Sequence, residues 1–65
     1  MPSSVIRAFD YQPDAERLDI TFTTGKRYAY LGVPAEIVRY LRAATSKGSY
    51  FNLCIRDHFP YEKLR

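Results

Sequence analysis

The chain has 65 residues with a formal net charge of +3, and 46% of the residues are apolar, 26% charged and 15% aromatic. This length and composition predict a single globular domain over residues 1–65 with a thin core, and they exclude a disordered chain. One cysteine excludes an intramolecular disulfide, no apolar run approaches the roughly 20 residues of a membrane span, and no secretory signal is visible. We therefore expect a cytoplasmic protein.

The first half of the chain predicts three strands. Residues Val5–Tyr11 form the first, and Gln12–Ala15 contain the proline and aspartate of a turn. Residues Arg17–Phe22 alternate apolar and polar side chains, which is typical of a strand with one buried face. Thr23–Gly25 has the length and the final glycine of a three-residue hairpin loop, so Lys26–Leu31 is the returning strand.

The length of this loop decides where two tyrosines point. A three-residue loop pairs Phe22 with Lys26, Ile20 with Tyr28 and Leu18 with Tyr30, so both tyrosines join the apolar face. A two-residue loop turns both to the other face. We favour the first register, because it fits the glycine and makes one face of the sheet consistently apolar.

Two helices follow. Pro34 suits a first helical position, and the apolar spacing that follows predicts a helix ending near Ala44 or Thr45. Ser46–Gly48 is a connector in this interpretation, and a short helix runs from the N-cap Ser49 to about His58. The tail after Pro60 is expected to fold back onto the domain. The predicted fold is α+β, a three-stranded antiparallel meander with one face covered by one longer and one short helix.

A set of short segments, spread over nearly the whole chain, is specific in its order and spacing. The segments are Ile6-Arg7-Ala8 with Tyr11, Leu18-Asp19-Ile20-Thr21-Phe22 with Gly25, Tyr28-Ala29-Tyr30, Val33-Pro34, Ala44-Thr45-Ser46-Lys47-Gly48, Tyr50-Phe51-Asn52 and Ile55-Arg56. In these residues the chain resembles the KTSC domain, a family named for the C-terminal extension of some bacterial lysyl-tRNA synthetases. One departure is Thr45, where the family commonly has proline.

The resemblance implies only a general class of function. Family members occur as small stand-alone bacterial and phage proteins as well as the synthetase extension. The synthetase association implies a role in RNA binding. It supplies no established functional residues to transfer to this chain.

The aromatic and basic residues give two candidate modes of RNA contact. Tyr28 and Tyr30 are either a platform on which bases stack or part of the core, and the favoured register points to the core. The segment Lys47, Gly48 and Ser49 is a candidate phosphate site, because glycine admits close approach and a helix starting at Ser49 offers free N–H groups. Its alternative is an ordinary helix connector.

Further positive charges extend the candidate phosphate-binding set. Its members outside the connector are Arg7, Lys26, Arg27 and Arg56. Arg7 and Arg27 are expected on the sheet face away from the helices, whereas Arg39 and Arg42 belong to the exterior of the first helix. This distribution does not predict one continuous basic patch.

No catalytic or metal-binding constellation is present in the sequence. Cys54 and His58 are the only members of their types, and a zinc site normally requires three or four ligands. The acidic residues show no paired acid and base. We expect a non-catalytic module without cofactor or metal.

The function that we favour is RNA or other nucleic-acid binding through phosphate contacts from Arg and Lys. The alternative is a protein-interaction module, self-association included, that uses an edge strand or the open sheet face around Phe9, Tyr11 and Leu31.

Overall fold

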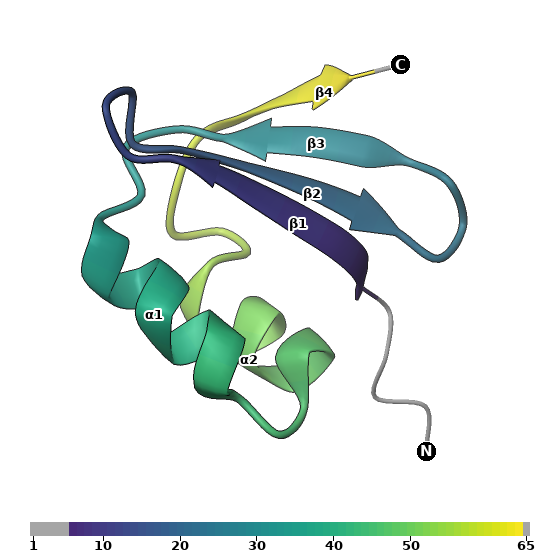
Figure 1. The fold of residues 1–65 in the computed structure, drawn as a ribbon. Coiled ribbons are helices and arrows are strands. Elements are labelled where there is room, and N and C mark those ends of the chain that lie inside the picture. Colours follow the sequence, from purple (N-terminus) through teal and green to yellow (C-terminus); the bar gives the residue numbers. More distant parts are fainter. Residues whose placement is uncertain (1–5, 65) are drawn as a thin grey trace.

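The computed structural model describes residues 6–64 as one antiparallel sheet with two helices beneath one face (Figure 1). The strands follow one another across the sheet in chain order. The elements are β1 (Ile6–Gln12), β2 (Arg17–Phe22), β3 (Arg27–Tyr30), α1 (Ala35–Ala43), α2 (Lys47–Cys54) and β4 (Tyr61–Leu64). The fold class is α+β, as predicted. Val5, the predicted start of the first strand, lies outside the described residues.

The hairpin between β2 and β3 has the three-residue loop that the sequence predicts. The amide of Phe22 donates to the Lys26 carbonyl at 2.8 Å, and the amide of Gly25 donates to the Phe22 carbonyl at 2.9 Å. Gly25 has a φ of +92°, a left-handed conformation that favours glycine. Ile20 therefore pairs with Tyr28 and Leu18 with Tyr30, which confirms that both tyrosines lie on the face toward the helices.

The sheet has four strands, so the prediction of three was wrong. Residues Tyr61–Leu64 return from the helices and pair antiparallel with β3, placing Tyr61 opposite Tyr30 and Lys63 opposite Tyr28. The tail does fold back, as expected, but it does so by adding an edge strand. Pro60 marks the entry to this strand, and its carbonyl accepts a hydrogen bond from the Leu31 amide at 2.9 Å.

Both helices begin one to a few residues away from the predicted positions. Pro34 is the N-cap of α1 and has an extended backbone, rather than being the first helical residue. The N-cap of α2 is Ser46, whose hydroxyl oxygen accepts from the Ser49 amide at 3.3 Å. Ser49 is therefore inside the first turn of α2 and is not its cap, because the earlier serine takes that role.

The second helix is also shorter than predicted. It ends at Cys54, and the Arg56 amide donates to the Phe51 carbonyl at 2.8 Å as the chain leaves the helix. Asp57 then adopts a φ of +68°, and the turn that follows directs the chain toward β4. Consequently His58 is exposed in a turn and does not share a helical face with Cys54.

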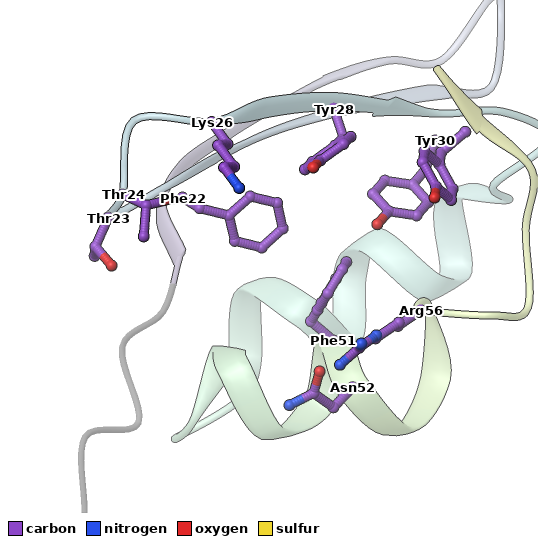
Figure 2. A pocket seen from close by; sticks show the side chains of 10 residues that line it. Phe22, Thr23, Thr24, Lys26, Tyr28, Tyr30, Phe51, Asn52 and Arg56 are labelled. Atoms are coloured by element: carbon purple, nitrogen blue, oxygen red, sulfur yellow. The ribbon is translucent and has the colours of Figure 1, made fainter. Parts of the chain in front are cut away.

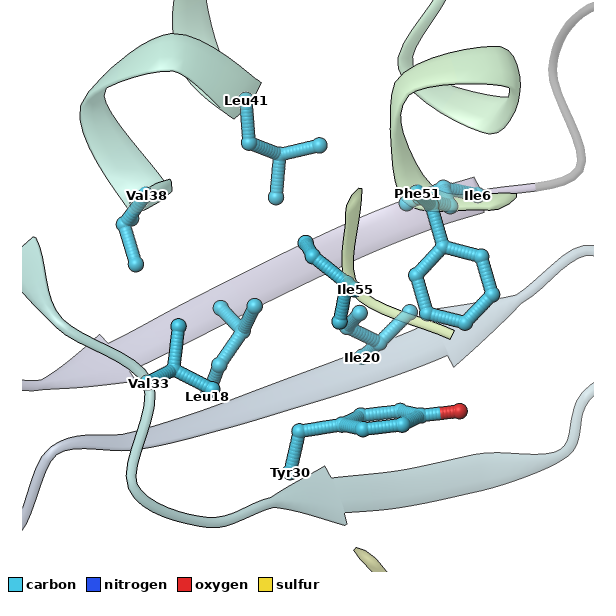
Figure 3. Close-up of a cluster of buried hydrophobic side chains, with 9 residues drawn as sticks. All are labelled: Ile6, Leu18, Ile20, Tyr30, Val33, Val38, Leu41, Phe51 and Ile55. Atoms are coloured by element: carbon cyan, nitrogen blue, oxygen red, sulfur yellow. The ribbon is translucent and has the colours of Figure 1, made fainter. Parts of the chain in front are cut away.

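The core lies between the sheet and the helices (Figure 3). The apolar alternation of β2 and the helical spacing of α1 supply its centre, as the sequence predicts for Leu18, Ile20, Val38 and Leu41. The complete cluster is Ile6, Leu18, Ile20, Tyr30, Val33, Val38, Leu41, Phe51 and Ile55.

Two residues expected on the open sheet face lie on the covered face instead. Phe9 pairs with Ile20 and Tyr11 with Leu18, and both pack against the core. The Tyr11 hydroxyl donates to the Val33 carbonyl at 2.7 Å. The cause is an irregularity in β1, whose register with β2 shifts between Ile6 and Ala8. Leu31 follows β3 and is half-buried. Because Phe9 and Tyr11 lie on the covered face, the predicted apolar open face is wrong.

Candidate nucleic-acid interface

Five aromatic side chains from four elements touch one another in a closed circuit. Phe22 contacts Tyr28, Tyr28 contacts Tyr61, Tyr61 contacts Tyr30, Tyr30 contacts Phe51, and Phe51 contacts Phe22. The ring centroids are 5.3–5.7 Å apart, and four of the five contacts are edge-to-face. Such ring contacts stabilise the fold by more than the burial of their apolar surface alone provides.

These five rings line a cavity of about 580 Å³, which we call the aromatic groove. It opens between β2, β3 and β4 on one side and α2 with the turn after it on the other. Figure 2 shows the sheet side chains pointing toward Phe51, Asn52 and Arg56. The remaining lining residues are Thr23, Thr24 and Lys26.

Two cationic side chains stand at opposite sides of the aromatic groove. Lys26 comes from the sheet side, close to Phe22, and Arg56 comes from the turn after α2, below Tyr30 (Figure 2). Both residues are exposed. The groove therefore joins aromatic surface to positive charge, which is the combination that proteins use to hold single-stranded nucleic acid.

Tyr28 and Tyr30 differ in their exposure. Tyr30 is 5% exposed and belongs to the core cluster, whereas Tyr28 is half-buried and is available at the groove wall. Burial raises the pKa of the Tyr30 phenol, because it disfavours the phenolate. Tyr61 and Tyr28 raise this pKa further, while the charge of Arg56 opposes the rise.

We expect stability to fall more steeply above about pH 10 in the wild type than in Tyr30→Phe. In the unfolded chain this phenol ionises near its ordinary pKa, while the folded state holds the proton to a higher pH. The stability is therefore present below about pH 10 and is lost as the pH rises through the raised pKa. Urea unfolding at about pH 8 and about pH 10.5 measures the difference. Tyr40→Phe, at a 55% exposed position, is the matched control, and an equal change in both variants would contradict the assignment.

The predicted phosphate site at Lys47, Gly48 and Ser49 has a different geometry from the one expected. All three residues belong to the first turn of α2, and Gly48 is buried. The Lys47 ammonium donates to the Ala44 carbonyl at 3.3 Å, and the Ser49 amide is already bonded to Ser46. None of the three residues lines the aromatic groove.

The sheet face away from the helices carries charges of both signs. The pairing of Asp10 with Asp19, Asp19 with Ala29 and Ala29 with Glu62 places three carboxylates in a row across the strands. Arg17 pairs with Asp19 at 2.7 Å, and its pKa is raised by that contact. Arg27 lies on this face as predicted, but the face is not a basic surface.

The other predicted cations are dispersed. Arg7 is exposed at the register shift of β1, so alternation does not fix its side of the sheet. Arg39 and Arg42 are exposed on α1, with the Arg42 guanidinium 5.7 Å from the centre of the Phe9 ring. Among the predicted phosphate-binding residues, Lys26 and Arg56 are the two that the fold brings to one cavity.

Within residues 6–64 no cluster of three or more His, Cys, Asp or Glu side chains is placed to hold a metal ion. In the same part of the chain, neither helix has the length and apolarity to cross a membrane.

Sequence reasoning missed most of the groove wall. The sequence places Phe22 on the apolar face of its strand without a role in a site, Phe51 and Asn52 enter only through the family resemblance, and Tyr61 belongs to a strand that the sequence does not predict. The one available signal was the hairpin register, which already placed Lys26 opposite Phe22 and hence on the face of Tyr28.

Taken together, the layer of two helices against a four-stranded antiparallel sheet defines a small two-layer α+β domain. The KTSC domain model matches residues 2–59, and this chain belongs to that family. The match ends before β4, so Tyr61 lies outside it.

A solved KTSC domain protein from Yersinia pestis shares the fold over the whole chain. It is 35% identical, the alignment covers 100% of this chain and 92% of that one, and the TM-score is 0.93. An uncharacterised protein of Stutzerimonas stutzeri is 34% identical over 98% of this chain and 92% of its own length.

The chain also matches part of a much larger enzyme. A lysine–tRNA ligase of Nostoc is 39% identical over 94% of this chain, but the match spans only 11% of the ligase. A second Nostoc ligase, from Nostoc punctiforme, gives the same identity and coverage. The resemblance to the KTSC family is thereby confirmed, and the domain occurs as a small module within a longer protein as well as in short ones.

Proposed function

We propose that this domain is a non-catalytic module that binds RNA through phosphate contacts from Lys26 and Arg56 at the aromatic groove. The observation that carries the proposal is the placement of these two cations on opposite sides of one cavity walled by aromatic rings. The occurrence of related sequence in lysine–tRNA ligases, which act on an RNA, supports the same class of ligand.

The distribution of charged side chains favours phosphate binding at the groove rather than at the open sheet face. Phosphates are repelled by carboxylates, and three of these stand in a row on the open face. Among residues 6–64, those that line the groove include two cations and no acidic side chain. Because phosphates carry no sequence information, we expect little sequence specificity from these contacts.

The test is an NMR titration of the isotope-labelled protein with a tRNA and with a short single-stranded RNA, at low and at moderate salt. We expect shifts at Lys26, Tyr28, Asn52 and Arg56 that weaken as salt rises, because binding to phosphates releases counterions. Absence of shifts at high RNA concentration, or shifts insensitive to salt, would contradict RNA binding. In that case a protein partner that pairs with an edge strand, β1 or β4, becomes the better hypothesis.

A further inference from the structure

The rings of the aromatic groove do not all offer a free face. Phe51 and Tyr30 are 4% and 5% exposed, so their faces are occupied by the core. Phe22 and Tyr28 are half-buried, whereas Tyr61 is 58% exposed. The most accessible ring is therefore that of Tyr61. It contacts both Tyr28 and the core residue Tyr30, of which Tyr28 is the more exposed.

The orientation of Tyr61 and Tyr28 limits what stacks there. Their centroids are 5.4 Å apart and their planes stand at 89° to each other. A flat ligand that stacks on Tyr61 meets Tyr28 at an angle and not as a second parallel platform. This geometry provides a stacking position for one planar group.

The two cations of the groove indicate which further groups the ligand carries. Lys26 and Arg56 stand on opposite sides of the rings, one on the sheet and one on the turn after α2 (Figure 2). Tyr61 pairs with Tyr30, so a planar group on Tyr61 has Arg56 at its own end of the groove and Lys26 farther along, toward the hairpin. The chemistry that matches is a nucleobase on a chain that carries phosphates along the groove.

We propose that the aromatic groove takes one unpaired base of single-stranded RNA, stacked on Tyr61, with phosphates of the same chain at Arg56 and Lys26. This inference rests on the proposed function and specifies its ligand. Bases in a duplex are stacked on their neighbours and keep their faces covered, so a double helix has no free base face to place on Tyr61.

The test compares a uridine trinucleotide with the same ribose-phosphate chain lacking all three bases. Stacking of one base on an aromatic side chain predicts an affinity about 5- to 150-fold lower for the abasic chain. Both oligomers carry the same phosphates, so both should retain the same dependence on salt. Fluorescence anisotropy or NMR shifts at Tyr61 measure the two affinities.

Three variants connect this loss to one ring. Tyr61→Leu should lower affinity for the intact trinucleotide by a similar factor and leave affinity for the abasic chain unchanged, while Tyr61→Phe should resemble the wild type. Tyr40→Leu is the matched control, because Tyr40 is 55% exposed and lies on α1 outside the groove. Thermal unfolding of each variant verifies that the fold is retained.

The outcomes separate this inference from the function on which it rests. Equal, salt-dependent affinity for the intact and abasic chains would leave RNA binding standing and overturn base stacking. A duplex that binds as tightly as the single strand, with shifts at Tyr61, would also overturn it. Failure of both oligomers and of tRNA to bind would reject the proposed function itself.

Discussion

Replacing Ile55 with alanine is expected to lower the free energy of unfolding by about 2–5 kcal/mol. The side chain is 0% exposed and lies in the core cluster, just after the end of α2. Its removal takes away buried apolar surface and leaves a cavity that a close-packed interior fills only partly. A domain of this length has a total stability of about 3–10 kcal/mol, so the variant should lose roughly half of its stability and unfold at a much lower urea concentration.

Leu53 provides the matched control for this variant. It lies two residues before Ile55 and is 74% exposed, so Leu53→Ala should change stability by no more than about 0.5 kcal/mol. Ile55→Val, which keeps most of the side chain, should cost about 0.5–1.5 kcal/mol and remain folded. Urea unfolding followed by circular dichroism gives all three values. Similar losses in Leu53→Ala and Ile55→Ala would contradict the described path of the chain beyond α2.

Loss of both groove cations should weaken RNA binding by roughly 100-fold at low salt. The variant combines Lys26→Ala with Arg56→Ala. Each substitution removes one charged contact, and such a contact is worth about 1.5 kcal/mol or more, which is roughly tenfold in affinity. The slope of log affinity against log salt should also become shallower by about 1.4, because two fewer phosphates are neutralised on a single strand.

The control for that variant carries the same change in net charge. It combines Arg27→Ala with Arg39→Ala, at two exposed positions that lie on the open sheet face and on α1, outside the groove. Lys26 and Arg27 are neighbours in sequence but project from opposite faces of the hairpin, so the comparison isolates position from charge. Affinity lost equally in the two double variants would indicate a diffuse electrostatic attraction and no defined site.

Local signals explain which parts of the fold were predictable. The β2–β3 hairpin was predicted with its register, because apolar alternation, loop length and Gly25 all agreed on one arrangement. The strand β4 was missed, since four residues after a proline carry little periodicity and their partner β3 lies some thirty residues earlier. The start of α2 was misplaced because Ser46 and Ser49 are both suitable caps, and sequence alone does not choose between them.

The residue types of the candidate site were predictable from the sequence, but their arrangement around one groove was not. Basic and aromatic residues were identified, including Lys26, Arg56, Tyr28 and Tyr30. The chain sequence does not show that Phe51 and Tyr61, from distant segments, complete one circuit with them. Conversely, Lys47 and Arg27 have the right charge but stand elsewhere, because helix start and strand alternation carry them away from the groove.

The position of β4 at the sheet edge ties ligand binding to local unfolding. This strand has four residues, three of them exposed, and it contributes no member of the buried core cluster. Its detachment therefore costs less free energy than global unfolding, yet it removes Tyr61 from the groove. Any ligand that requires Tyr61 binds only the docked form and must, by linkage, stabilise the docking of β4 by an amount that grows with the logarithm of its concentration relative to its Kd.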